Sequence, residues 1–311
     1  MSDVGALLAN ARGGRTADVA RLLSMVENEE PGADEVIKAT YAHTGRAIVV
    51  GVTGPPGAGK STLVASLTAA YLRTGVRIAV VAVDPSSPYT GGAILGDRIR
   101  MRELYLEADV FIRSMANRGN SGGLARATRR VVSVLDAIGF DVVLVETVGA
   151  GQQEVEVARV VDTVCLVLIP GAGDDIQALK AGIMEIADVL VVNKADRPGA
   201  DEAVQDLTQM LTLGTPRTDW RPPVIKTVAT NGTGVDELIA AIQKHRTWAA
   251  ESGEARRRSA DAMRNEIQLL LRERVLRDLA ERVDSRRLAE VVMQVVNKTL
   301  DPYGAVDVLL T

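Results

Sequence analysis

Short runs of consecutive aliphatic residues, separated by segments of helix length, constrain the fold of this chain more than any other feature. Runs of this length, rich in Val and Ile, are typical of strands that are buried on both faces of a sheet. Their alternation with helical segments predicts an α/β fold, with a mostly parallel sheet flanked by helices and built from right-handed crossovers. The predicted strands are Ile48–Val52, Ile78–Val83, Val142–Val145, Val164–Ile169, Val189–Val192 and Val224–Val228.

The two ends of the chain have helical patterns instead. From residue 1 to 45, apolar residues recur at helical spacing with breaks at Gly13-Gly14 and Pro31-Gly32, which predicts a preface of short helices. From Glu251 to Glu290, Arg and Glu are dense, and regularly spaced apolar residues predict one long amphipathic helix. The charges fit a solvated face, and the narrow apolar stripe also fits a dimerisation arm. We therefore expect an N-terminal helical segment (1–45), an α/β domain (46–248) and a C-terminal helical arm (249–311).

Composition narrows the possible partners. The 311-residue chain has a net charge of −4 and only 3% aromatic residues, whereas proteins that bind nucleic acid usually carry a basic excess or aromatic stacking platforms. No apolar run approaches the ~20 residues that span a bilayer, and the amino terminus does not resemble a signal peptide. We expect a cytoplasmic protein that binds neither nucleic acid nor membrane, and we expect its single cysteine, Cys165, to be buried in a strand.

A phosphate-binding motif joins the first predicted strand to the next helix, Leu63–Leu72. Residues 54–61 read G-P-P-G-A-G-K-S, and in this context the pattern is typical of a P-loop, whose glycines turn backbone N–H groups toward phosphate oxygens. We expect Lys60 to reach the β- and γ-phosphates and the Ser61 hydroxyl to bind Mg²⁺. The expected nucleotide contacts are Gly54, Pro55, Pro56, Gly57, Ala58, Gly59, Lys60, Ser61 and Thr62.

A second motif follows the strand Val189–Val192. Residues 193–196 read N-K-A-D, which resembles the N-K-x-D signature of guanine-nucleotide-binding proteins. The resemblance implies that Asp196 accepts hydrogen bonds from guanine N1–H and its amine, that Asn193 bonds the other edge of the base, and that the Lys194 stem covers the ring. A weaker match, Thr227, Val228 and Ala229, lies where GTPases place a backbone N–H against guanine O6.

Acidic residues follow two other predicted strands. Residues 146–149 read E-T-V-G, which resembles the D-x-x-G motif of GTPases with Glu in place of Asp. We expect Glu146 to hold Mg²⁺ through water and the Gly149 N–H to sense the γ-phosphate. Asp84 ends another strand, and a flexible connection leads from it to Asp97. Both are candidate Mg²⁺ ligands in a segment that orders around the γ-phosphate, although Asp97 also fits a plain surface loop.

One departure from the GTPase pattern concerns the attacking water. Ras-like GTPases place a water-orienting Gln directly after D-x-x-G, whereas this chain has Ala150, with Gln152 and Gln153 further on. The departure predicts slow intrinsic hydrolysis that a partner accelerates.

Four strings in order resemble one family, the MeaB/ArgK/MMAA-type G proteins, which are GTPase chaperones of adenosylcobalamin-dependent methylmalonyl-CoA mutase. They are AVDPSSPYTGGAILGDRIRM from Ala82, ETVGAGQQE from Glu146, PGAGDDIQALKAGIMEIAD from Pro170 and VNKAD from Val192. The resemblance implies a P-loop GTPase domain, a homodimer formed by the C-terminal arm, and GTP-gated loading and protection of the mutase cofactor. It also implies a mobile loop from Gly173 to Lys180 that couples the nucleotide site to the mutase. The expected catalytic residues are Lys60, Asp97, Glu146, Gly149 and Lys180, and the expected Mg²⁺ ligands are Ser61, Asp84, Asp97 and Glu146.

Two other functions fit parts of the sequence. This family also carries an older label, an ATPase or kinase serving lysine/arginine/ornithine transport, but N-K-A-D argues against ATP. A nickel-delivery GTPase would need Cys or His ligands, and the chain has only Cys165, His43 and His245. Other acyl-CoA mutases also remain possible clients, and the glycine-rich loop 117–123 has no assigned role.

Overall fold

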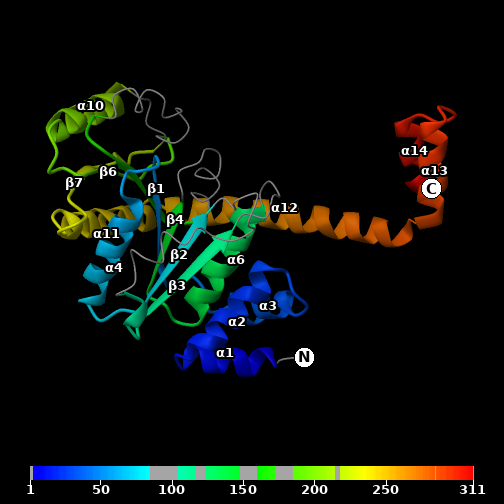
Figure 1. Cartoon of the computed structure of the whole chain (residues 1–311), viewed down its shortest axis with the longest axis horizontal. Helices are drawn as coiled ribbons and strands as arrows, with labels where there is room; N and C mark the ends of the chain where they lie inside the picture. The colour runs from blue at the N-terminus through cyan, green and yellow to red at the C-terminus, as the bar shows by residue number, and fades with distance from the viewer. Residues whose placement is uncertain are drawn as a thin grey trace. The chain divides into compact units, whose positions relative to one another are not determined.

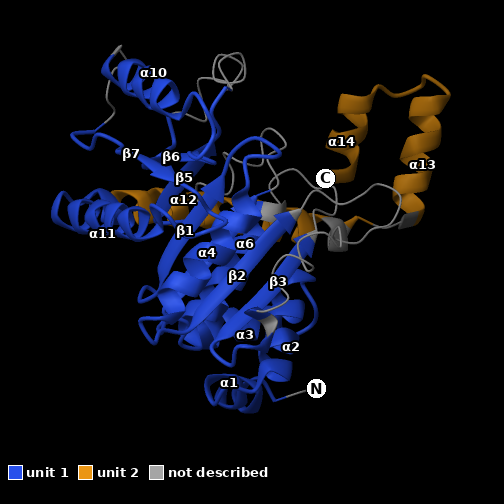
Figure 2. Ribbon diagram, turned by 60° about the vertical axis from the view of Figure 1, so that its left-hand side comes forward, with its two compact units in different colours: residues 1–256 blue, residues 257–311 orange. Residues whose placement is uncertain are grey.

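The computed structural model describes residues 3–84, 104–116, 123–147, 160–171, 185–213, 218–283 and 285–310. The chain divides into two compact units, residues 1–256 and residues 257–311 (Figure 2). Each unit is described by itself below.

The described part of unit 1 is built on one sheet of seven parallel strands, in the spatial order β3-β2-β4-β1-β5-β6-β7 (Figure 1). Strands β4, β5 and β6 are buried along their whole length, as expected for parallel strands covered on both faces. The predicted α/β fold is therefore confirmed. The strands are β1 (Ile48–Thr53), β2 (Ile78–Asp84), β3 (Val110–Ala116), β4 (Val142–Thr147), β5 (Thr163–Leu168), β6 (Val189–Asn193) and β7 (Val224–Thr227).

Helices cover both faces of this sheet (Figure 1). Helices α4 (Lys60–Leu72) and α11 (Val235–Glu251) share one apolar core with alternate residues of the central strands. On the opposite face, α6 (Gly123–Ala137) packs on β2 and β4, while α10 (Ala200–Leu213) packs on β6 and β7. The cores are almost wholly aliphatic, so close packing of Val, Leu, Ile and Ala supplies most of the burial.

The predicted helical preface consists of α1 (Val4–Arg12), α2 (Thr16–Glu27) and α3 (Ala33–Tyr41). These helices are separated at the two predicted breaks, where Gly14 and Gly32 adopt positive φ angles of 89° and 93°. Helices α2 and α3 pack against α6 and extend its apolar core.

A buried carboxylate joins the preface to the sheet. Asp136 of α6 accepts hydrogen bonds from three consecutive backbone N–H groups at the entry to β1, those of Gly45, Arg46 (3.1 Å) and Ala47 (2.9 Å). Because a carboxylate that accepts several backbone N–H groups fixes all of them at once, Asp136 sets the direction in which the chain enters the sheet.

Strand β3 was not predicted from the sequence, which is the first correction. Among the described strands it lies at the edge of the sheet and pairs with β2 alone. Arg113 interrupts its apolar pattern, because this side chain points to α2 and donates from Nε to Glu27 at 3.0 Å. The ion pair adds to the apolar core that Phe111 and Met115 of β3 share with residues of α2.

The predicted single helix from Glu251 to Glu290 is wrong at both ends. Helix α11 already extends to Glu251, and Gly253, with a φ angle of 77°, separates it from α12 (Glu254–Arg282). Glycine commonly ends a helix in this conformation. A further helix, α13, begins at Ser285.

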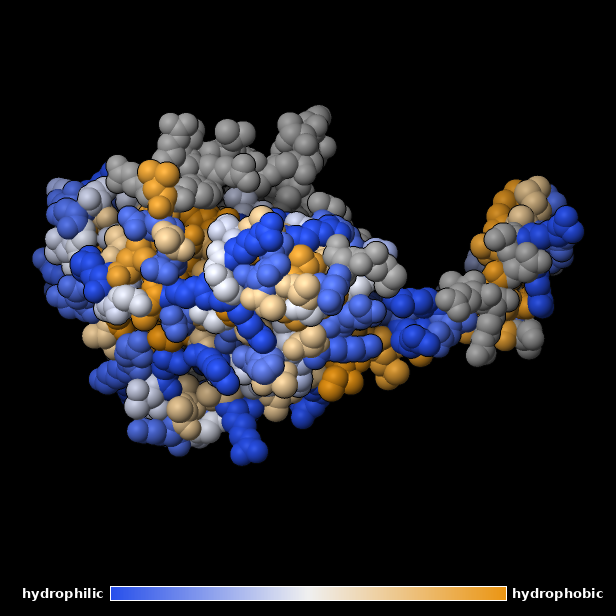
Figure 3. Space-filling view, turned by 90° about the horizontal axis from the view of Figure 1, so that it is seen from below, coloured by the Kyte–Doolittle hydropathy of each residue, from blue (hydrophilic) through white to orange (hydrophobic). Residues whose placement is uncertain are grey.

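Unit 2 leaves much apolar surface exposed (Figure 3). Helices α13 (Ser285–Val296) and α14 (Pro302–Leu310) pack together as a hairpin that buries Val291 and Ala305. Figure 3 shows apolar surface on these helices beside charged side chains. The exposed large apolar residues of α12, α13 and α14 are Ile267, Leu270, Leu271, Val275, Leu276, Leu288, Val292, Met293, Val296, Tyr303, Val306, Val308 and Leu310.

No helix in the described residues is both long enough and apolar enough to cross a membrane.

Aspartates cap the amino edge of the sheet, by which we mean the end where the parallel strands begin. Asp141, Asp162 and Asp188 each precede a strand and accept a hydrogen bond from a backbone N–H at the start of the neighbouring one. The Asp188 carboxylate, for example, accepts from Val164 N at 2.9 Å. Although part of Asp162 is exposed, desolvation of its carboxyl raises the pKa above its ordinary value.

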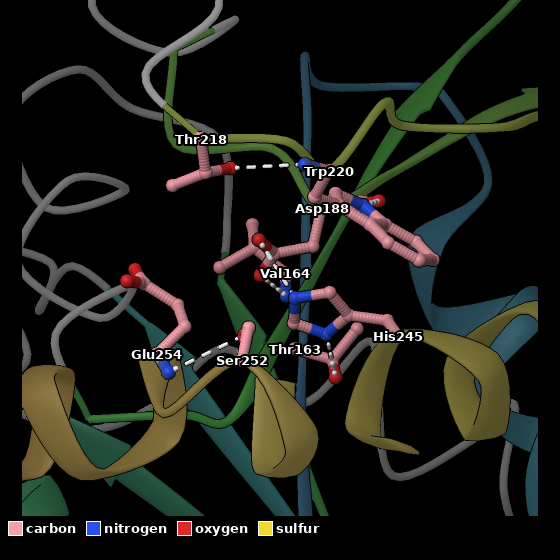
Figure 4. A network of polar contacts seen from close by, with 8 residues as sticks. All are labelled: Thr163, Val164, Asp188, Thr218, Trp220, His245, Ser252 and Glu254. Atoms are coloured by element: carbon pink, nitrogen blue, oxygen red, sulfur yellow. Dashed lines mark hydrogen bonds and ion pairs between the residues drawn. The ribbon is translucent and has the colours of Figure 1, made fainter. Parts of the chain in front are cut away.

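A fully buried histidine joins α11 to the same edge (Figure 4). His245 Nδ1 lies 2.8 Å from Thr163 Oγ1, and Nε2 lies 3.2 Å from Asp188 Oδ1. The Trp220 indole N–H donates to the Asp188 carbonyl at 2.8 Å, and Trp220 and Trp248 pack around the imidazole ring. This network joins the starts of β5 and β6 to the last turns of α11.

Candidate functional site

The phosphate loop leaves β1 at the carboxyl edge of the sheet, by which we mean the end where the strands finish. Two of its glycines are required sterically. A Cβ on Gly54 (φ 142°) would lie 2.1 Å from the Val167 carbonyl oxygen, and one on Gly59 (φ 88°) would lie 2.5 Å from Asn193 Nδ2. Helix α4 begins directly after Gly59, so the N–H groups of its first turn and its partial positive charge meet the loop.

Lys60 lies inside the loop rather than in solvent. Its side chain is buried, and Nζ donates hydrogen bonds to the carbonyl oxygens of Gly54 (2.7 Å) and Pro55 (2.9 Å). The backbone of the loop therefore curls around the ammonium. The loop carbonyls accept its hydrogen bonds, and phosphate oxygens are able to accept them in their place.

Ser61 and Glu146 meet across the gap between α4 and β4. Both are buried, and the Ser61 hydroxyl donates to Glu146 Oε1 at 2.6 Å. A hydroxyl and a carboxylate side by side are hard oxygen donors of the kind that Mg²⁺ prefers. The residues present at this position therefore fit a magnesium ion.

The residues of the N-K-x-D motif are bonded to the phosphate loop. Asn193 donates from Nδ2 to the Ala58 carbonyl at 2.9 Å, and Lys194 donates from Nζ to the Gly57 carbonyl at 2.8 Å. Asp196 is exposed. The structure thus brings the two predicted motifs together, although 132 positions separate Ser61, the last residue of the first motif, from Asn193, the first residue of the second.

Asn193 has a different position from the predicted one. Only 1% of the residue is exposed, and its Oδ1 accepts from Thr227 Oγ1 (3.1 Å) and the Ala229 N–H (3.2 Å), while its amide nitrogen bonds Ala58. Because both ends of the amide bond protein groups, Asn193 holds the phosphate loop and the segment 227–229 together. The Val228 N–H donates to the Thr233 carbonyl at 3.0 Å.

Several predicted site residues lie outside the described residues. They are Asp97, Gly149 and Lys180, together with Ala150 and the loop 117–122. Asp84 is the last residue of β2, and its side chain is likewise not described. The roles predicted for these residues stay predictions.

Cys165 is fully buried in β5, as predicted, and burial raises the pKa of its thiol well above the ordinary value. The thiol is therefore protonated at neutral pH and is a packing group.

Two threonines at this edge were not singled out from the sequence. Thr147, next to Glu146, donates from Oγ1 to Thr53 Oγ1 at 2.8 Å, and Thr53 directly precedes Gly54. The sequence signal is slight: Thr53 precedes the first residue of the phosphate loop, and Thr147 follows the first residue of E-T-V-G.

The glycine-rich loop at the start of α4, its buried lysine and the adjoining N-K-x-D residues define a P-loop protein of the guanine-nucleotide-binding class. The chain belongs to the family described as methylmalonyl Co-A mutase-associated GTPase MeaB, whose family model matches residues 19–284. The resemblance inferred from the four sequence strings is thereby confirmed, and the protein is a GTPase of this family.

Relatives of this chain support the same assignment. A putative GTPase of Pyrococcus horikoshii is 46% identical over 100% of this chain and 98% of its own length. GTPase ArgK of Escherichia coli is 36% identical, with 94% and 91% covered. The mitochondrial methylmalonic aciduria type A homolog of Mus musculus is 34% identical, with 84% and 64% covered.

Among solved structures, one described as a LAO/AO transport system kinase is 30% identical to this chain. It superposes with a TM-score of 0.73 and covers 98% of this chain and 96% of its own. Its fold agrees with the seven-stranded sheet found here.

Proposed function

We propose that this protein is a Mg²⁺-dependent GTPase chaperone that gates adenosylcobalamin loading and protection of methylmalonyl-CoA mutase. One observation carries the nucleotide half of the proposal, namely that Asn193 and Lys194 bond directly to the carbonyls of Ala58 and Gly57 in the phosphate loop. The family description and the name of the mouse relative support the client half.

Phosphate binding is assigned to the loop and to Lys60. When phosphate oxygens enter, the Lys60 ammonium exchanges the carbonyls of Gly54 and Pro55 for the β- and γ-phosphates. Negative charge that develops on the transferring phosphoryl group then meets a cation that is already buried and needs little reorganisation.

Magnesium is assigned to Ser61 and Glu146, with Asp84 and Asp97 as further predicted ligands. When bound, Mg²⁺ supplies positive charge to the β- and γ-phosphate oxygens. The Ser61–Glu146 hydrogen bond holds the two donors close together beforehand, so little side-chain entropy is lost when they turn to an ion. Gly149 and Lys180 are proposed to contact the γ-phosphate and to couple the site to the client, respectively.

Base selection is assigned to Asp196 and Lys194. The exposed Asp196 carboxylate only accepts hydrogen bonds, which suits the N1–H and amine donors of guanine and leaves adenine without a matching pair. Asn193 acts indirectly because its amide fixes the phosphate loop and segment 227–229, which is proposed to lie near guanine O6.

The proposal includes a slow enzyme and a dimer. Ala150 stands where a water-orienting Gln is expected, so the client is proposed to accelerate hydrolysis. The exposed apolar side chains of the C-terminal arm, residues 249–311, are proposed to form a homodimer. We expect Leu271→Asp to yield a monomer in light scattering, while the matched Gln268→Asp, also at an exposed position of α12, stays dimeric.

The chain's single cysteine is also consistent with the proposed cytoplasmic location, where disulfides are rare.

The decisive experiment combines nucleotide choice and client choice. The purified protein is mixed with the host's adenosylcobalamin-dependent mutases in GDP or a nonhydrolysable GTP analogue, and both complex formation and GTP turnover are measured. We expect nucleotide-dependent capture of a methylmalonyl-CoA mutase and faster turnover in its presence. Capture of an isobutyryl- or ethylmalonyl-CoA mutase instead would reassign the client, and preference for ATP would favour the kinase alternative.

A further inference from the structure

The hydroxyl pair Thr53–Thr147 lies beneath the nucleotide site, on the other face of the sheet from Ser61 and Glu146. Both threonines are buried, at 3% and 2% exposure. Side chains alternate between the two faces along a strand, so Glu146 faces α4 while the next residue, Thr147, faces the α6 side. Hydrogen bonds therefore hold the end of β4 from both faces.

The hydroxyl bond continues the pairing of β1 and β4 past the end of their backbone ladder. Val52 and Glu146 are the last residues that β1 and β4 pair in register. One residue further, Thr147 Oγ1 donates to Thr53 Oγ1 at 2.8 Å. The strand that carries the phosphate loop and the strand that carries the acidic residue are thus joined at the point where each leaves the sheet.

Together with two bonds described above, this pair closes a ring. Lys60 Nζ donates to the Gly54 carbonyl, and Ser61 Oγ donates to Glu146. Each of the three hydrogen bonds connects to the next through a peptide link between neighbours in sequence. The six members, in order, are Thr53, Gly54, Lys60, Ser61, Glu146 and Thr147.

Two other buried threonine hydroxyls have local partners. Thr40 donates to the Val36 carbonyl and Thr68 donates to the Val64 carbonyl, each one turn back in its own helix. The Thr53–Thr147 bond differs because it joins residues 94 positions apart that each adjoin a proposed phosphate or magnesium group.

We propose that Thr53 and Thr147 are positioning residues that set the distance between the phosphate loop and Glu146, and thereby the affinity of the site for Mg²⁺. The inference rests on the proposed function, because it takes Ser61 and Glu146 as magnesium ligands. Without the hydroxyl bond, the ends of β1 and β4 separate more freely, and the two donors are less often within reach of one ion.

The experiment removes the hydroxyl bond while keeping the side-chain volume. Thr147→Val, Thr53→Val and the double variant are compared with wild type, with Thr147→Ser as rescue and Thr68→Val as the matched control for loss of a buried hydroxyl. The main readout is the Mg²⁺ concentration that half-maximally slows the release of a fluorescent GDP analogue. The free energy of unfolding and GDP affinity in EDTA are measured beside it.

We expect each single valine variant to raise the Mg²⁺ midpoint about three- to tenfold, as loss of one net hydrogen bond implies. GDP affinity in EDTA is unchanged, Thr147→Ser restores the midpoint, and Thr68→Val loses stability without moving it. The double variant regains stability because neither hydroxyl is left buried alone, yet its midpoint stays raised.

The inference is overturned if the double variant regains both its stability and the wild-type Mg²⁺ midpoint, because the pair would then have a structural role alone. Single variants with unshifted midpoints would overturn it as well while leaving the proposed function intact. Wild-type GDP release that ignores Mg²⁺ would overturn both.

Discussion

The two edges of the same sheet are organised by opposite principles. At the amino edge, Asp141, Asp162 and Asp188 bond backbone N–H groups of neighbouring strands, which are permanent partners. At the carboxyl edge, Lys60 and Ser61 bond a loop carbonyl and a carboxylate. A phosphate or a metal ion is able to replace these partners. The polar groups of the carboxyl edge are therefore hydrogen-bonded before a ligand binds, and they can exchange those bonds for bonds to the ligand. We infer that stability resides mainly at one edge and ligand chemistry at the other.

The largest effect that tests this division is expected from Lys60→Ala. It removes the buried cation that meets the developing charge, so GTP turnover should fall about 100- to 1000-fold. Turnover by Lys60→Ala and by Lys244→Ala, at an exposed position of α11, is measured in one assay. If both variants keep similar activity, the assignment of Lys60 is wrong.

Asp196→Asn is expected to change base preference without affecting the fold. The new amide donor faces guanine's amine, and this mismatch costs on the order of 2–4 kcal/mol, or roughly 30- to 1000-fold in GTP affinity. Xanthine has a carbonyl at that position, so xanthosine nucleotides should bind better than guanosine nucleotides. Calorimetric titration with GDP and xanthosine diphosphate measures the switch, with Asp206→Asn on α10 as control. Equal GDP binding by both variants would show that Asp196 does not contact the base.

Asp188→Ala tests the amino edge. It leaves the Val164 N–H without its acceptor and removes the carboxylate beside the buried His245 ring, so the free energy of unfolding should fall by about 2–4 kcal/mol. GDP affinity of the folded protein should remain that of wild type, because the whole sheet separates this network from the nucleotide site. Urea unfolding of Asp188→Ala is compared with that of Asp206→Ala. If both variants lose the same free energy of unfolding, the network around Asp188 does not stabilise the protein.

The smallest effect is expected from Asp162→Asn, and it depends on pH. Desolvation raises the pKa of Asp162 in the folded state, so its contribution to stability is fully present below the unfolded pKa and is lost as pH rises through the folded value. Asparagine still accepts from Val49 N and does not ionise. The variant should therefore exceed wild type in stability at pH 7, with the difference closing toward pH 4, as urea unfolding at both values will show. A constant difference would contradict a protonation origin.

The strands and both motifs were predictable because their signals are local. Continuous aliphatic runs identified six strands, whereas β3 escaped because Arg113 breaks its pattern to reach α2. The hydrogen bonds that Asn193 makes at both ends of its amide were not predictable. They require β6 to lie beside β7 and close to the phosphate loop. The bond between Thr53 and Thr147 likewise depends on β1 pairing with β4, although β2 and β3 lie between them in the chain.

The cluster around His245 has a spectroscopic consequence. Trp220 and Trp248 are the chain's two tryptophans, and both lie against this imidazole with ring centroids 5.0 Å and 5.7 Å from it. Tryptophan fluorescence, excited selectively over that of the five tyrosines, therefore originates at the amino edge, far along the strands from the nucleotide. A change in emission when GTP binds would report motion relayed through the sheet, and the protein carries this probe without any label.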